Sequence, residues 1–71
     1  MGYYIQANMA GSIWKILVNT DDKVEAGQEV VILESMKMEI PITADTKGCV
    51  KKILFNEGDF VNEGDNLIEI D

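Results

Sequence analysis

The side chains of this protein that could do chemistry are gathered in one short segment, Glu34-Ser35-Met36-Lys37-Met38-Glu39. It offers one primary amine, on Lys37, and two carboxylates, on Glu34 and Glu39, that could be interpreted as an acid–base pair. No pocket-forming sequence surrounds the two carboxylates, so solubility or recognition by a partner explains them better. The sequence contains no histidine, which excludes Ser-His and Cys-His nucleophile pairs and histidine metal sites.

The segments on either side of Lys37 predict a tight β-hairpin with Met36-Lys37 at its tip. The apolar run Val30–Leu33 leads in and Ile40–Thr43 leads out, and two strand-like segments with almost nothing between them form hairpins. A two-residue hairpin loop needs positive φ, which favours glycine, yet no glycine lies between Leu33 and Ile42. Holding another residue there costs about 1–3 kcal/mol, and such conformations concentrate at functional sites. The alternative is an ordinary solvated lysine at a hairpin tip.

Length, charge and cysteine content narrow the class of protein. The chain has 71 residues and a net charge of −7, which indicates one domain and makes binding to nucleic acid improbable. No apolar run approaches the roughly 18 residues of a membrane span, and the first residues do not resemble a secretory leader. Cys49 is the single cysteine, so an internal disulfide is excluded. We therefore expect a cytoplasmic protein that binds no membrane.

The sequence contains an internal repeat with a period of 37 residues. Residues 11–34 align with residues 48–71, and eight of the 24 positions are identical, where average composition would give roughly one or two. The identical pairs are Gly11/Gly48, Lys15/Lys52, Ile16/Ile53, Leu17/Leu54, Asn19/Asn56, Asp22/Asp59, Val24/Val61 and Gly27/Gly64. The chain is thus interpreted as a single domain, 1–71, built from two copies of one β unit. The link between copies should place Lys37 at the end away from the termini.

Each copy is predicted to run strand, turn, short strand, turn, strand, and no segment has a helical period. The longer predicted strands are Tyr3–Asn8, Ser12–Val18, Val30–Ser35, Met38–Thr43, Cys49–Phe55 and Asn66–Ile70. Seven or eight short strands with frequent turns are typical of a small sandwich or flattened barrel.

Three other features have structural explanations. Cys49 aligns with Ser12 beside a glycine, which favours a small, half-buried position over a reactive thiol. The two acidic Asn-Glu-Gly-Asp segments, Asn56–Asp59 and Asn62–Asp65, do not have the spacing of an EF-hand, so turn formation is the better interpretation. Pro41 lies inside a predicted strand, which indicates an edge strand or an outward-facing position.

The segment around Lys37 resembles the attachment motif of biotinyl domains, whose usual form is Glu-Ala-Met-Lys-Met with the lysine biotinylated. The resemblance covers nearly the whole chain: Met9–Ile13 is similar to the family's Met-Pro-Gly segment, with Ala10 in place of proline, and Val24–Gln28 and Glu57–Val61 are similar to its two turn segments. At this length the chain is most similar to stand-alone biotin/lipoyl attachment proteins. Ser35 stands where the usual motif has alanine.

The resemblance implies an all-β fold, a flattened β-barrel or barrel-sandwich hybrid of two pseudo-two-fold related four-stranded antiparallel sheets. It implies a non-catalytic carrier, biotinylated on Lys37 by biotin protein ligase, that shuttles carboxyl groups between biotin carboxylase and carboxyltransferase sites. It also implies roles for the neighbours in recognition: Met36 and Met38 as flanking contacts, and Glu34, Ser35 and Glu39 as contacts of the ligase.

Two alternatives stay open. A lipoyl carrier would use the same fold and the same Lys37, although the lipoyl motif usually reads Asp-Lys-Ala and Met-Lys-Met favours biotin. An unmodified β module could instead bind proteins through its methionine-rich tip. An autonomous enzyme is disfavoured, because the chain offers no nucleophile–base pair.

Overall fold

The computed structural model describes residues 2–71, which form eight β-strands and no helix. The strands are β1 (Tyr3–Gln6), β2 (Gly11–Ile16), β3 (Lys23–Val24), β4 (Glu29–Ser35), β5 (Met38–Thr43), β6 (Gly48–Ile53), β7 (Phe60–Val61) and β8 (Asn66–Ile70). The predicted all-β class is confirmed, and β5 and β8 have the predicted bounds. Nothing in residues 2–71 forms a helix of the length and apolar character needed to cross a membrane.

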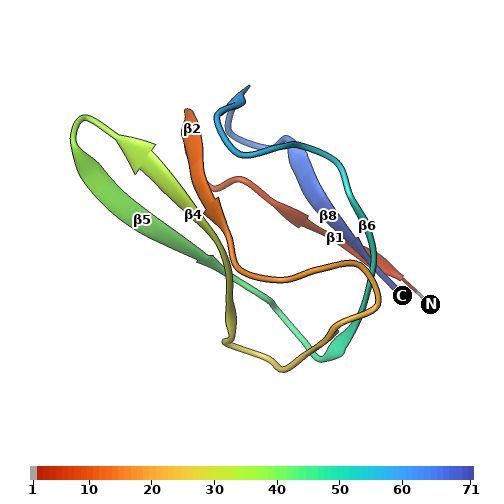
Figure 1. Cartoon of the computed structure of the whole chain (residues 1–71). Coiled ribbons are helices and arrows are strands. Elements are labelled where there is room, and N and C mark those ends of the chain that lie inside the picture. Colours follow the sequence, from red (N-terminus) through yellow and green to blue (C-terminus); the bar gives the residue numbers. More distant parts are fainter. Residues whose placement is uncertain (1) are drawn as a thin grey trace.

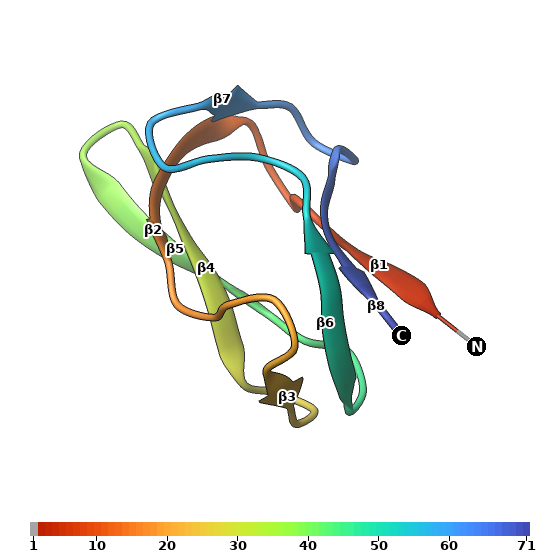
Figure 2. The same cartoon turned by 45° about the vertical axis from the view of Figure 1, so that its right-hand side comes forward.

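The strands form two four-stranded antiparallel sheets, in the orders β1-β8-β6-β3 and β5-β4-β2-β7. A shift of 37 residues exchanges β1 with β5, β2 with β6, β3 with β7 and β4 with β8, and so converts one sheet order into the other. Figures 1 and 2 show the two sheets facing each other, with the β4–β5 hairpin extending at the end opposite the chain termini. The expected pair of pseudo-two-fold related sheets is therefore present.

The equivalence of the two halves reaches further toward the N-terminus than the repeat at residues 11–34 indicates. Ile5 corresponds to Ile42 and Ala7 to Ala44, and all four side chains are buried. β1 and β5 therefore contribute equivalent side chains to the core. The residues around these positions differ too much between the halves for the sequence alignment to reveal the equivalence.

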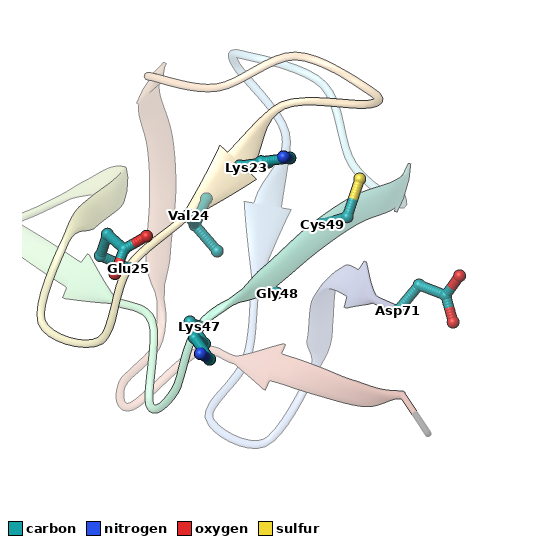
Figure 3. Close-up of a pocket in the computed structure, with 7 residues that line it drawn as sticks. All are labelled: Lys23, Val24, Glu25, Lys47, Gly48, Cys49 and Asp71. Carbon is teal, nitrogen blue, oxygen red and sulfur yellow. The ribbon is translucent and has the colours of Figure 1, made fainter.

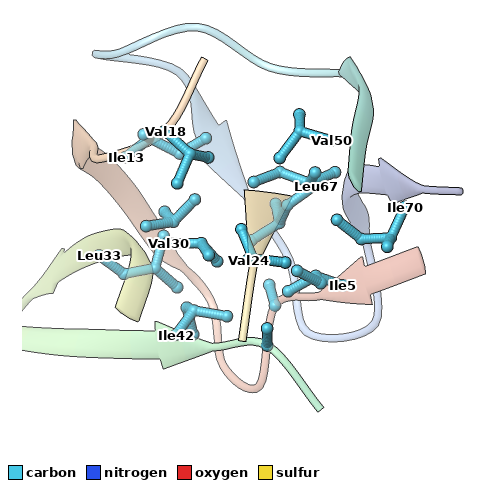
Figure 4. Packing of buried hydrophobic residues seen from close by; sticks show 14 of the residues in the cluster. Ile5, Ile13, Val18, Val24, Val30, Leu33, Ile42, Val50, Leu67 and Ile70 are labelled. Carbon is cyan, nitrogen blue, oxygen red and sulfur yellow. The ribbon is translucent and has the colours of Figure 1, made fainter. Parts of the chain in front are cut away.

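The core lies between the two sheets and consists of aliphatic side chains from both halves (Figure 4). Leu33, Leu67, Ile68 and Ile70 are the largest of the fully buried side chains, and burying such a side chain contributes about 1.5–3 kcal/mol. No polar or charged side chain of residues 2–71 is buried. Apolar packing thus stabilises a chain whose single cysteine excludes an internal disulfide.

Four turns of the same geometry connect the strands within the halves. In each, the amide of the fourth residue donates to the carbonyl of the first, and the side-chain oxygen of the fourth accepts from the amide of the first. The turns are Asn19–Asp22, Glu25–Gln28, Asn56–Asp59 and Asn62–Asp65. Their third residues have positive φ: Asp21, Gly27, Gly58 and Gly64. Turn formation therefore accounts for the acidic Asn56–Asp59 segment, as predicted, and residues 2–71 contain no cluster of three metal-ligating side chains.

Three predicted strands end earlier than expected. β1 ends at Gln6 rather than Asn8, β2 ends at Ile16 rather than Val18, and β6 ends at Ile53 rather than Phe55. For β2 and β6 the reason is that β2 and β3, like β6 and β7, belong to different sheets, so the chain must leave one sheet and cross to the other. Val18 is buried during this crossing, which explains the apolar pattern that made the strand look longer.

Pro41 lies on β5, which is an edge strand of its sheet. Proline has no amide hydrogen for a sheet ladder and is tolerated where a strand has a free side. The edge placement predicted for this residue is confirmed.

Candidate functional site

The tip of the β4–β5 hairpin has the strained geometry that its sequence predicts. Ser35 pairs with Met38 as the last rung of the ladder, which leaves Met36 and Lys37 as a two-residue loop. Their φ angles are 52° and 66°, as a type I′ turn requires of both central residues. Both positions would favour glycine or asparagine, yet they hold a methionine and a lysine.

The side chains of the tip face solvent. Met36 is 93% exposed and Met38 is 64% exposed, and Lys37 is exposed between them. Met36 lies in the loop and Met38 begins β5, and neither side chain is part of the core. Large flexible apolar side chains held in water are a feature of surfaces that bind partners.

Glu34 and Glu39 lie directly opposite each other on the hairpin, one rung below Ser35 and Met38. Both are exposed, and Ser35 is half-buried. Like charges directly opposite on two strands destabilise the pair, by an amount on the order of 0.2–1 kcal/mol. The repulsion between these carboxylates is thus a second local free-energy cost close to Lys37, in addition to the strained turn. Both carboxylates are exposed to solvent and do not line opposite walls of a pocket.

The base of the tip is held tightly against β2. A Cβ atom on Gly11 would lie 2.8 Å from the backbone oxygen of Glu34 and 3.4 Å from the Cβ of Ser35, so only glycine permits this approach. Leu33 and Ile42, on the two strands of the hairpin, are buried in the core. Lys37 is therefore an exposed side chain on a hairpin whose base is packed closely against β2 and the core.

A hollow lies beside the tip, between the hairpin and the strands β2 and β7. It is lined by Ala10, Gly11, Ser12, Glu34, Ser35, Met36, Lys37 and Phe60. Phe60 pairs with Ser12 across the β2–β7 ladder, and its side chain is 63% exposed. No local motif identifies Phe60 as part of the tip; the one signal in the sequence is that the repeat aligns it with Lys23, so that an aromatic side chain stands where the other half has a charged one.

Cys49 lies in a different part of the molecule. It is half-buried, as predicted, and its Sγ lies 3.5 Å from the carbonyl oxygen of Asp21. Together with Lys23, Val24, Glu25, Lys47, Gly48 and Asp71 it lines a second hollow, formed by β3, β6 and the C-terminal end of the described chain (Figure 3). The thiol is thus not part of the tip.

The arrangement at the tip supports one chemistry best. Lys37 presents a primary amine to solvent, and the only ion pair within residues 2–71 is Lys51–Glu69, so no carboxylate within that part of the chain holds the amine. An accessible amine on a rigid projection can be acylated by a second protein that approaches from outside. These residues fit a covalently attached carboxylic acid such as biotin or lipoate.

Comparison with known proteins agrees with this geometry. Residues 2–70 match the family model described as "Biotin-requiring enzyme". The chain is 59% identical over 66 residues to the biotin/lipoyl attachment protein of Bacillus subtilis, covering 93% of this chain and 90% of that protein. It is 50% identical over 64 residues to the biotin carboxyl carrier protein of Streptococcus mutans, covering 90% of this chain and 49% of that one.

The fold comparison points the same way. The structure superposes on the Kluyveromyces lactis urea carboxylase with a TM-score of 0.91 and 37% sequence identity, covering 99% of this chain and 6% of that protein. The chain thus spans nearly all of the Bacillus subtilis relative, about half of the Streptococcus mutans protein and a small part of the urea carboxylase.

Proposed function

The chain belongs to the family of biotin-requiring enzymes, and on this premise we propose that it is a carrier domain biotinylated on Lys37. The observation that carries the proposal is the exposed lysine at a positive-φ tip between two exposed methionines. A sequence selected for stability would place Asn-Gly there. The strained turn is explained when the amine must be offered to another protein.

Lys37 acts as the nucleophile in its own modification. The amine attacks the carbonyl carbon of a biotinyl-adenylate held by biotin protein ligase, a C–N bond forms, the C–O bond to the phosphate breaks, and AMP leaves. Lysine amines are protonated at neutral pH, so the ligase must accept a proton from Nζ. Acylation removes the positive charge of Lys37, so the net charge of the chain, which is −7 before modification, becomes more negative by one unit.

The residues around Lys37 determine how the ligase recognises the tip. Met36 and Met38 offer flexible apolar contacts on both sides of the amine. Glu34 and Glu39 present a pair of negative charges below it, and the half-buried Ser35 leaves no bulk beside the hairpin. The ligase is thus expected to bring an apolar surface to the tip and positive charge to the side of the hairpin.

Once biotin is attached, the chain carries it rather than acting on it. Biotin supplies a ureido nitrogen that carries a carboxyl group between a biotin carboxylase site and a carboxyltransferase site. The rigid hairpin and the lysine arm raise the effective concentration of the cofactor at each site. The alignment with pyruvate carboxylase from Staphylococcus aureus supports this role. This chain aligns with 6% of the length of that protein, which is the share expected of one carrier domain within a carboxylase.

A lipoyl carrier is the second candidate, favoured by the name of the Bacillus subtilis relative, which covers both cofactors. The same amine would be acylated, and the tip geometry would serve equally. Met-Lys-Met favours biotin over lipoate.

Intact mass spectrometry of the chain purified from its own cells tests the proposal. We expect the mass of one biotinyl group in addition to the polypeptide, and its complete loss in Lys37→Arg. Lys52→Arg is the matched control, because Lys52 is an exposed strand lysine and its replacement should leave the modification intact. An added mass that matches a lipoyl group would instead support the second candidate, a lipoyl carrier that uses the same lysine. An unmodified wild-type chain in cells with active ligase and ample biotin would overturn both.

A further inference from the structure

The outer faces of the two sheets differ in chemistry at equivalent positions. Trp14 is the extra residue of a β-bulge in β2, beside Ile32 of β4, and Lys51 is the extra residue of the equivalent bulge in β6. The Nζ atom of Lys51 lies 3.8 Å from a carboxylate oxygen of Glu69. A shift of 37 residues relates Trp14 to Lys51 and Ile32 to Glu69. Two apolar side chains on one sheet thus replace an ion pair on the other.

The apolar side chains lie on the outer face of the sheet that carries the hairpin. Val31 and Leu33 are buried, and side chains alternate between the faces of a strand, so Ile32 between them faces outward. Pro41 lies directly opposite Ile32 and is exposed, and Trp14 is 42% exposed. We call Trp14, Ile32 and Pro41 the outer patch.

We propose that the outer patch is a docking surface for the biotin carboxylase that loads the attached cofactor, and that this enzyme meets it with an apolar pocket bordered by cationic side chains. This inference rests on the proposed function and adds to it a contact outside the tip. The Ile32–Pro41 pair lies three rungs below the last pair of the hairpin, Ser35–Met38, a distance of about 10 Å along the strands. An enzyme surface around the entrance to an active site that receives the tip therefore reaches the patch.

The charges beside the outer patch indicate a cationic partner. Glu34 and Glu39 form the pair between the patch and the tip, and both are exposed. In the described part of the chain the only ion pair is the one between Lys51 and Glu69, so neither carboxylate is paired there. A cation from a partner relieves the repulsion between two opposed carboxylates, and complementary charges next to an apolar contact fix its orientation.

Trp14 has the properties of an anchor for a partner. The Nζ atom of Lys15 lies 5.5 Å from the centroid of its ring, a cation–π contact that favours one position of the ring. No hydrogen bond to the indole N–H is made within residues 2–71, whereas a buried indole N–H usually has a partner. Tryptophan is also enriched among the residues that dominate binding energy. We therefore expect the pocket of the enzyme to offer a carbonyl acceptor.

A contact outside the tip serves the carboxylase better than the ligase. The ligase meets each chain once and acts on Lys37 itself, beside which Met36 and Met38 already offer contacts. The carboxylase must capture the carrier in every turnover. A weak docking surface that holds the carrier at the enzyme raises the effective concentration of the tethered biotin at the active site.

Exchanging the side chains of the two outer faces tests the proposal. Trp14→Lys combined with Ile32→Glu introduces the ion pair of the other sheet, and Lys51→Trp combined with Glu69→Ile is the matched control. The probe is the biotin carboxylase purified from the cells that make the chain, assayed by bicarbonate-dependent ATP hydrolysis against the concentration of biotinylated carrier. We expect the first variant to raise KM for the carrier by roughly tenfold with kcat unchanged. The control should keep the wild-type KM.

Mass spectrometry of each variant separates this inference from the carrier function. Only fully biotinylated chains enter the assay, so an unchanged KM would overturn the docking surface and leave the carrier function standing. Failure of the ligase to modify the first variant, with the control modified, would also overturn it, because the patch would then serve the ligase. A wild-type chain that sediments as a dimer through Trp14 would overturn it as well.

A single substitution keeps the test decisive if the first variant fails to fold, which thermal melts reveal. Trp14→Lys alone changes a side chain that is 42% exposed and outside the core. It should raise KM for the carrier by roughly fivefold, as the loss of one anchor does, and leave the rate with free biotin unchanged. An unchanged KM in this variant would overturn the proposal.

Discussion

The hairpin that carries Lys37 and the pair of strands at the chain ends are the same structural element in the two halves. β4 pairs with β5 as β8 pairs with β1, and Leu33 opposite Ile40 corresponds to Ile70 opposite Tyr3. In one half the Met36-Lys37 turn joins the two paired strands directly, whereas β1 and β8 pair across the whole domain. The same paired element is thus used in both halves, and the exposed lysine lies in the turn that connects only one of the two pairs.

The largest expected effect tests whether the two halves contribute equally to the core. Leu33→Ala and its counterpart Ile70→Ala each remove a fully buried side chain, and each should lower the free energy of unfolding by about 2–5 kcal/mol. Urea denaturation measures both. Leu17→Ala and Leu54→Ala are matched controls, because these equivalent leucines are 46% and 37% exposed, and they should cost far less. A large loss in one half only would show that the halves are not energetically equivalent.

An intermediate effect tests whether strain at the tip is retained for function. Replacing Met36 by Asn and Lys37 by Gly installs the favoured type I′ turn, and should raise the free energy of unfolding by about 1 kcal/mol. The same variant should carry no biotin by mass spectrometry. The control Met36→Asn keeps the amine and should gain part of the stability. A double variant no more stable than the wild type would mean that the tip stores no strain.

The smallest expected effect compares two equivalent turns. Asp21 and Gly58 occupy the same place with φ of 76° and 93°, and a Cβ at Gly58 would meet open space. Gly58→Asp should therefore lower stability by roughly 0.5 kcal/mol, because the cost of positive φ for aspartate is partly offset by the reduced freedom of the unfolded chain. Asp21→Gly should raise stability by roughly 0.5 kcal/mol, because relief of the backbone strain exceeds the cost of the greater freedom of glycine in the unfolded chain. Thermal melts of the pair measure both, and changes of the same sign would contradict the equivalence.

The fold could be predicted in large part from the sequence, because strands, turns and repeat give local signals. The positive φ at Met36 and Lys37 followed from the two-residue length of the hairpin loop, and the bounds of Met38–Thr43 followed from its flanking turns. The ends of β2 and β6 could not be predicted, because Val18 and Phe55 belong to crossings between sheets and keep an apolar pattern there. Which sheet a strand joins is decided by packing between distant segments.

The candidate site could likewise be predicted from the sequence only in part. Lys37 and its methionines are adjacent in the sequence, so one motif identifies them together. Phe60 reaches the tip through β7, which pairs with β2 over a separation of 48 residues between Ser12 and Phe60. No local sequence pattern predicts that Phe60 lies beside the tip. The only indication in the sequence is that the repeat aligns Phe60 with Lys23.

The pairing of β1 with β8 has a mechanical consequence for a carrier under tension. Tyr3 lies opposite Ile70 at the open end of an antiparallel pair, so a pull between Gly2 and Asp71 loads the hydrogen bonds one after another, as in a zipper. Such a pair yields at lower force than one in which all bonds are loaded together. The β4–β5 hairpin lies at the end of the molecule opposite the termini (Figure 1), so the hydrogen bonds that such a pull loads first are remote from Lys37.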